Sequence, residues 1–169
     1  YLKVKKQLTP SLNALIKVSN EGCQVIVTYP NNDVGGEVIK KCLKKISIKK
    51  NSNIQIIKSL GRYNYHGVLA LAKKKSNMIV CVGNSSSGIK ETPFFGCPTV
   101  NIGSRQNGRL RANNVIDVDY NKNEIYLAIK KCLHNENFRK KCRNVKNPYK
   151  GGNAGKLTAI SLAKMKLNL

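Results

Sequence analysis

The apolar and polar positions of the chain alternate between short apolar runs and longer stretches with helical spacing. The apolar runs are rich in Val, Ile and Thr, and they predict strands over residues 23–28, 54–57, 78–82, 99–102 and 115–118. Apolar residues spaced three and four apart predict helices over residues 8–18, 37–46, 65–74, 89–95, 123–133, 137–143 and 154–166. This alternation predicts an α/β fold, in which helices cover both faces of one parallel sheet.

Local signals refine this outline. Pro10 lies near the start of the first helix, where proline is tolerated, and Asn123 is the expected cap of the fifth. No internal repeat or low-complexity linker divides the 169 residues. We therefore expect a single domain over residues 1–169.

Four polar loops follow the predicted strands, at residues 29–36, 60–63, 83–88 and 103–114. The carboxyl ends of parallel strands lie along one edge of a sheet, and ligands bind there. The third loop, Gly83-Asn84-Ser85-Ser86-Ser87-Gly88, opens a short helix and offers N–H groups and hydroxyls to an anion. We therefore expect a phosphate pocket, and the alternative is a surface turn that binds only water.

Individual residues of this region have functional and structural interpretations. Ser85 and Ser86 are candidate phosphate donors, or ordinary helix caps. Arg105 is the best candidate cation, ahead of Arg109 and Arg111, and the alternative is a solvated arginine. Glu91 cannot help to bind phosphate, but it could accept hydrogen bonds from the paired hydroxyls of a sugar. Its alternative role is to stabilise a helix start.

The chain has few groups for acid/base chemistry, with eight acidic residues and two histidines. His66 and His134 are expected to be structural or solvated. For Asn31 and Asp33, which follow a strand, a local Asx turn is favoured over ligand binding. The sequence therefore predicts a domain that binds a ligand rather than one that supplies catalytic acid/base groups.

The formal net charge of +23 is compatible with nucleic acid, anionic membrane or phosphorylated ligands. The lysines are spread over nearly every segment, only 6% of the residues are aromatic, and no nucleic-acid motif is evident. We expect no specific nucleic-acid partner and no membrane partner, because no apolar run approaches the roughly 20 residues of a span. A basic nucleic-acid-binding module is the alternative.

The six cysteines show no CxxC spacing, so we expect no metal site. Several occupy apolar positions, as reduced cysteines do in the core of a cytoplasmic protein. The first residue is Tyr1 rather than Met, and we expect the chain to be a piece of a longer protein.

Five motifs in chain order carry a resemblance to a known family. They are residues 29–35, 83–91, 95–109, 114–118, and 147–149 with 152–154, and the second reads Gly83-Asn84-Ser85-Ser86-Ser87-Gly88-Ile89-Lys90-Glu91. Together they resemble the UDP-N-acetylglucosamine 2-epimerases of the hydrolysing type, which serve sialic acid biosynthesis.

The resemblance implies a fold of two Rossmann-like domains that face each other across a cleft, as in B-type glycosyltransferases. Residues 1–169 would be the C-terminal, nucleotide-binding domain. Ser85 and Ser86 would bind the diphosphate, Glu91 the ribose hydroxyls, and Arg105 the nucleotide pocket. Other residues that it places at the pocket are Asn31, Leu60 and Gly61, with Ser87, Gly88, Arg62 and Arg109 as additional candidates.

The implied reaction is elimination of UDP from UDP-N-acetylglucosamine, followed by addition of water to give N-acetylmannosamine. The catalytic acid/base residues are unknown and would belong to an N-terminal domain, so this chain alone would be inactive. The resemblance implies no cofactor, and it implies a homo-oligomer for the full-length enzyme. The alternatives are the related epimerase that acts on a UDP-diacetamido sugar of the legionaminic acid route, and a glycosyltransferase of the same fold.

The sequence departs from the family pattern in two places. Leu110 stands where the family usually has an acid, and Lys150-Gly151 replaces the usual Gly-Asp. The second change removes a carboxylate near the pocket, so we expect it to alter contacts to the sugar.

Overall fold

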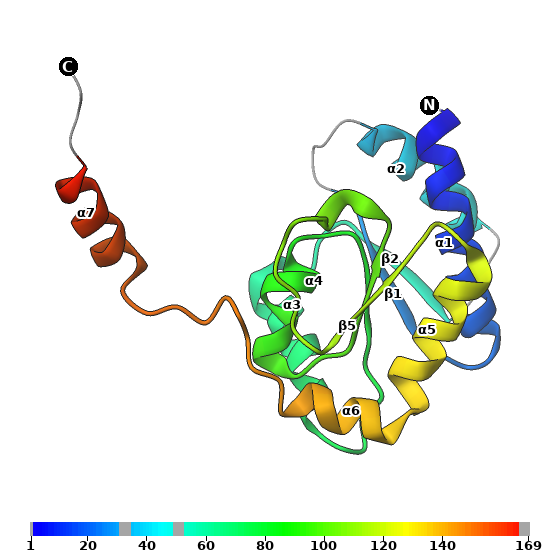
Figure 1. Cartoon of the computed structure of the whole chain (residues 1–169). Coiled ribbons are helices and arrows are strands. Elements are labelled where there is room, and N and C mark those ends of the chain that lie inside the picture. Colours follow the sequence, from blue (N-terminus) through cyan, green and yellow to red (C-terminus); the bar gives the residue numbers. More distant parts are fainter. Residues whose placement is uncertain (1, 31–34, 49–52, 166–169) are drawn as a thin grey trace.

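The computed structural model describes residues 2–30, 35–48 and 53–165 (Figure 1). Its α-helices are α1 (Leu2–Asn20), α2 (Gly36–Ile48), α3 (Gly61–Ala70), α4 (Ser87–Lys90), α5 (Lys122–His134), α6 (Glu136–Arg143) and α7 (Ala154–Lys164). Its strands are β1 (Val25–Thr28), β2 (Ile54–Ile57), β3 (Cys81–Gly83), β4 (Thr99–Ile102) and β5 (Val115–Val118). Short 3₁₀ helices occur at η1 (Leu71–Lys73), η2 (Thr92–Phe95) and η3 (Ser104–Gln106).

All strand pairs are parallel, but the strands form two hydrogen-bonded sheets rather than the single predicted sheet. One sheet pairs β1 with β2, and the other has the order β3-β4-β5. Side chains of β1, β2 and the second sheet nevertheless share one core with α1 and α5. A smaller apolar cluster consists of Leu69 of α3, Ala72 of η1, and Cys97. The α/β fold with helices on both faces is therefore confirmed. The prediction of one continuous hydrogen-bonded sheet was wrong.

The largest difference between a predicted helix start and the structure is at α1. The helix begins at Leu2, six residues before the predicted start, and Pro10 lies inside it. Proline has no N–H to donate to the carbonyl four residues earlier, which lowers the local stability of the helix. Ala14 and Val18 bury this helix against the core. Tertiary packing thus outweighs the local cost of the proline.

Three other predicted features differ from the structure, and the first two lie at the site. The helix expected from residue 65 begins at Gly61, so the loop at residues 60–63 is largely helical. The helix expected over residues 89–95 is interrupted at Glu91, which joins α4 to η2. The cap of α5 is Asn121 rather than Asn123, and its side chain accepts from the N–H groups of Asn123 and Glu124.

Helix α7 stands away from the rest of the domain (Figure 1). Every residue of the helix is exposed, including the apolar residues Leu157, Ile160 and Leu162. None of the helices in the described ranges has the length and hydropathy that crossing a membrane requires.

All six cysteines are free thiols, and Cys97, Cys132 and Cys142 are buried. Burial raises the pKa of Cys132 to about 12 and that of Cys142 to about 11. These thiols therefore stay protonated at neutral pH and behave as small apolar side chains.

Candidate functional site

A cavity of about 1000 Å³ opens at the carboxyl ends of β1, β2 and β3. The residues that follow these strands and line it are Thr28, Tyr29, Pro30, Lys58, Ser59, Leu60, Gly61, Arg62, Ser85, Ser86 and Ser87. Three of the four predicted loops therefore converge on one edge. The fourth loop, residues 103–114, is fully described and contributes no residue to the lining.

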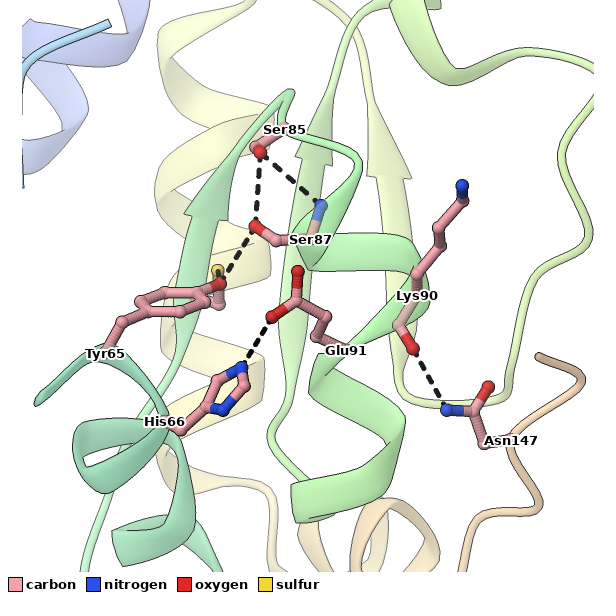
Figure 2. A network of polar contacts seen from close by, with 8 residues as sticks. Tyr65, His66, Ser85, Ser87, Lys90, Glu91 and Asn147 are labelled. Atoms are coloured by element: carbon pink, nitrogen blue, oxygen red, sulfur yellow. Dashed lines mark hydrogen bonds and ion pairs between the residues drawn. The ribbon is translucent and has the colours of Figure 1, made fainter. Parts of the chain in front are cut away.

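Ser85, Ser86 and Ser87 form a turn, called the serine turn below, in which Ser85 and Ser87 are hydrogen-bonded to each other. Ser85 Oγ accepts a hydrogen bond from Ser87 Oγ at 3.1 Å and from the Ser87 N–H at 3.4 Å (Figure 2). Ser86 is the N-cap residue of α4, and its side chain makes no capping hydrogen bond. The capping role that competed with ligand binding is therefore absent at Ser86, which lines the cavity.

Glu91 lies at the junction of α4 and η2, and its side chain reaches the same cavity. Its Oε2 atom is 2.7 Å from Nε2 of His66, and 43% of the Glu91 side chain is exposed. Because a carboxylate only accepts, the Nε2 atom of His66 must carry the proton of this hydrogen bond. Figure 2 shows the second oxygen of Glu91 pointing away from His66.

Residues of the cavity wall that sequence reasoning missed include Lys58 and, on α3, Tyr65 and His66. His66 was expected at a helix start in a structural or solvated role, but it lies inside α3 and contacts Glu91. Tyr65 donates to Ser87 Oγ at 3.0 Å, and burial, with a smaller effect of the nearby Cys81 thiol, raises the pKa of its phenol. These contacts join positions more than twenty residues apart, so no local motif could reveal them.

The arginines of the 103–114 loop do not reach into the cavity. Arg105 Nη1 donates to the carbonyl of Asn84 at 3.2 Å, next to Gln106 Nε2, which donates to the same oxygen at 2.7 Å. Arg111 binds the Asp117 carboxylate. The 103–114 loop therefore binds the backbone of Asn84, which directly precedes the serine turn. The cations that line the cavity are instead Lys58 and Arg62.

Two other predicted site residues lie outside the cavity lining, and a third is outside the described residues. Arg109 is exposed, and its side chain is not part of the cavity wall. Gly88 is buried beneath the turn, where an added Cβ would lie 3.2 Å from Thr99 Cγ2. Asn31 lies outside the described residues, together with Asp33.

The motif at residues 147–149 supports the helix that carries Glu91. Asn147 Nδ2 donates to the carbonyl of Lys90 at 3.0 Å (Figure 2), and Tyr149 OH donates to the carbonyl of Leu110 at 3.2 Å. Leu110, one of the two departures from the family pattern, is exposed. This segment therefore connects α4 to the 103–114 loop.

A second cavity, of about 1180 Å³, lies between α6 and residues 144–148. Its lining includes the basic residues Arg111, Lys140, Lys141 and Lys146 and contains no carboxylate. The first cavity combines hydroxyl donors, two cations and a carboxylate at the carboxyl edge of the strands, so it is the better candidate for a nucleotide. Within the described ranges, no three His, Cys, Asp or Glu side chains are grouped as metal ligands would be.

The family model described as UDP-N-acetylglucosamine 2-epimerase matches residues 2–163. The chain belongs to the UDP-N-acetylglucosamine 2-epimerase family. The match spans every residue that lines the first cavity. The Rossmann-like α/β architecture predicted for this epimerase family is the one that the structure has.

Curated members of the epimerase family are similar over most of this chain. A GDP/UDP-N,N'-diacetylbacillosamine 2-epimerase (hydrolyzing) of Campylobacter jejuni is 36% identical over 117 residues, which are 69% of this chain and 28% of that protein. A UDP-N,N'-diacetylbacillosamine 2-epimerase (hydrolyzing) of Legionella pneumophila is 39% identical, over 66% of this chain and 27% of its own. A UDP-N-acetylglucosamine 2-epimerase of Neisseria meningitidis is 38% identical, over 64% and 26%. The matched region is thus little more than a quarter of each relative.

Proposed function

We propose that this chain is the C-terminal, nucleotide-binding domain of a hydrolysing 2-epimerase and that its first cavity binds the UDP part of a UDP-sugar. The observation that carries the proposal is the convergence of the Ser85–Ser87 hydroxyls, the Glu91 carboxylate and two cations at one cavity. Hydroxyls and cations suit a diphosphate, and a carboxylate suits paired ribose hydroxyls. Membership of the epimerase family supports the same ligand.

In this proposal Ser85 and Ser86 donate to the diphosphate, Glu91 accepts from the ribose, and Leu60 and Gly61 lie near the uracil ring. Lys58 and Arg62 line the same cavity and add positive charge for the leaving diphosphate. Arg105 is bound to the carbonyl of Asn84. It therefore acts by holding the serine turn in place, or on the nucleotide directly once its side chain leaves that carbonyl.

The proposed reaction of the whole enzyme is elimination of UDP from the sugar nucleotide and addition of water to the product. Its acid and base would come from another domain, since the chain spans little more than a quarter of its relatives. The exposed apolar residues of α7, Leu157, Ile160 and Leu162, support contact with that domain. The chain alone should therefore bind UDP but release none from a UDP-sugar.

Two sugars are compatible with the proposal. The relative from Neisseria meningitidis is named for UDP-N-acetylglucosamine, and two others are named for UDP-N,N'-diacetylbacillosamine. Their identities to this chain, 36% to 39%, are too similar to favour one. We propose UDP-N-acetylglucosamine as the substrate, with the diacetamido sugar as the second candidate. Epimerisation assays of the whole enzyme with each sugar nucleotide distinguish them.

Titration calorimetry of the full chain with UDP tests the proposal. Glu91→Gln should weaken UDP binding by about 10-fold, because a charged acceptor of ribose hydroxyls is lost. The matched control is Glu136→Gln, because Glu136 is an exposed residue on α6, paired with Lys75, outside the cavity lining. A folded chain that binds no UDP, or equal effects of the two substitutions, would contradict the proposal.

A further inference from the structure

Two neighbouring residues of α3, Tyr65 and His66, each contact one of the groups proposed to hold the nucleotide. Tyr65 reaches the serine turn, and His66 reaches Glu91 (Figure 2). Neither side chain was expected at the site from the sequence. One helix therefore contacts the proposed ribose acceptor and, through Ser87, the proposed phosphate donor Ser85.

The contact of Tyr65 sets the direction of a chain of hydroxyls. Tyr65 OH donates to Ser87 Oγ at 3.0 Å, and Ser87 Oγ donates to Ser85 Oγ at 3.1 Å. A serine hydroxyl has two acceptor positions and one proton. The acceptor positions of Ser85 are occupied by Ser87 Oγ and the Ser87 N–H. The group that Ser85 has left to offer is its proton, and a proton donor is what a phosphate oxygen requires.

The contact of His66 fixes the carboxylate of Glu91. His66 Nε2 lies 2.7 Å from Glu91 Oε2, and the ring packs against Phe95 with 5.1 Å between centroids. The aromatic contact restrains the imidazole, so the hydrogen bond holds the carboxylate in one rotamer. Among the described residues, the other oxygen of Glu91 has no side-chain partner, and it is available to accept from a ligand.

We propose that Tyr65 and His66 are positioning residues, which orient Ser85 as a donor to the diphosphate and Glu91 as an acceptor for the ribose hydroxyls. The inference rests on the nucleotide-binding function proposed above. It assigns to α3 the task of presenting both groups before UDP arrives. Preorganisation of this kind lowers the entropy that binding must overcome.

Calorimetry of the full chain with UDP and with 2′-deoxy-UDP tests the role of His66. His66→Ala should weaken UDP binding by about 10-fold and should reduce the preference for UDP over 2′-deoxy-UDP. His66→Gln keeps an N–H donor at a similar reach, and it should restore affinity to within about 3-fold of the wild type. The matched control is His134→Ala at the end of α5, which should have no effect, since that histidine lies outside the cavity lining.

Double-mutant cycles separate positioning from a general loss of structure. In a Glu91→Gln background, His66→Ala should have little further effect on UDP affinity, because there is no carboxylate left to orient. Tyr65→Phe keeps the ring in the core and should weaken UDP binding by about 3-fold, an effect that should vanish in a Ser85→Ala background. Tyr63→Phe is the control on the same helix, since Tyr63 is 91% exposed. Thermal midpoints of all variants show whether they are folded.

The outcomes distinguish this inference from the proposed function. If the wild type binds no UDP, the proposed function fails, and the positioning role fails with it. If the wild type binds UDP and Glu91→Gln weakens binding, but His66→Ala and Tyr65→Phe do not, only the positioning role is overturned. Additive effects in the double mutants would also overturn it, because they would show that the residues act independently.

Discussion

Replacing Thr92 with valine should destabilise the domain beneath the serine turn while it preserves the shape of the side chain. Thr92 is fully buried, and its hydroxyl is the centre of a hydrogen-bond network. It donates to the carbonyl of Gly88 at 2.8 Å and accepts from Thr99 Oγ1 at 2.8 Å and from Asn114 Nδ2 at 3.0 Å. The network therefore joins α4 to β4 and to the residue before β5.

The substitution removes all three of these hydrogen bonds, and each is worth about 1 kcal/mol net. The Thr99 hydroxyl and the Asn114 amide keep one other acceptor, the carbonyl of Cys97, at 3.4 and 2.7 Å. One N–H of the buried Asn114 amide loses its acceptor, which adds to this cost, so we expect the free energy of unfolding to fall by at least about 3 kcal/mol. That is a large part of the roughly 5–15 kcal/mol that stabilises most domains.

Urea unfolding followed by circular dichroism measures the loss. We expect Thr92→Val to lower the midpoint with an unchanged slope, which indicates a change in stability alone. The matched control is Thr158→Val, because Thr158 is exposed on α7, and it should change stability by less than about 0.5 kcal/mol. A loss below about 1 kcal/mol for Thr92→Val would refute the reasoning, because a buried hydroxyl with three partners would then contribute no more than one ordinary hydrogen bond.

Two further substitutions test other contacts. Gly96 has a φ of 60°, and an added Cβ would lie 2.7 Å from Arg143 Cα, so Gly96→Ala should cost about 3 kcal/mol in urea unfolding. Gly108→Ala, at a φ of 78° in open space, should cost only about 1 kcal/mol, and equal losses would contradict this account. Hydrogen bonds from Lys130 and, to a smaller extent, Tyr126 lower the pKa of Glu21 from its ordinary value of 4.5. The ionised Glu21 side chain therefore stabilises the fold above pH 4.5, and this stabilisation is lost as the pH falls through the lowered pKa. Glu21→Gln should therefore lower the thermal midpoint at neutral pH by an amount that shrinks in acid, and a gap independent of pH would exclude the explanation.

Strands with a strong local signal could be predicted from the sequence to the residue. The ranges of β2, β4 and β5 are as predicted, since their branched apolar residues occupy buried or half-buried positions. The start of α1 could not be predicted, because Pro10 opposes a helix locally and the packing of Ala14 and Val18 decides the outcome. The division into two sheets also depends on tertiary placement, which periodicity does not encode.

Some residues of the candidate site could likewise be predicted from the sequence, and others could not. Ser85, Ser86 and Glu91 could be identified because they lie in one contiguous motif beside a strand. Tyr65 and His66 could not, because their contacts with Ser87 and Glu91 exist only once α3 packs beside α4. Arg105 was expected over the anion, but its side chain binds a backbone carbonyl instead. A guanidinium has several potential acceptors, and the sequence does not rank them.

The central claim is that UDP binds at the edge formed by α3 and the serine turn. The most direct measurement is a titration of the isotopically labelled full chain with UDP, followed through backbone amide chemical shifts. We expect the largest shifts on residues 60–66 and 83–91, and no shifts on α7 or on the basic second cavity along α6. Shifts centred on Lys140, Lys141 and Lys146, or no shifts at all in a folded chain, would contradict this claim.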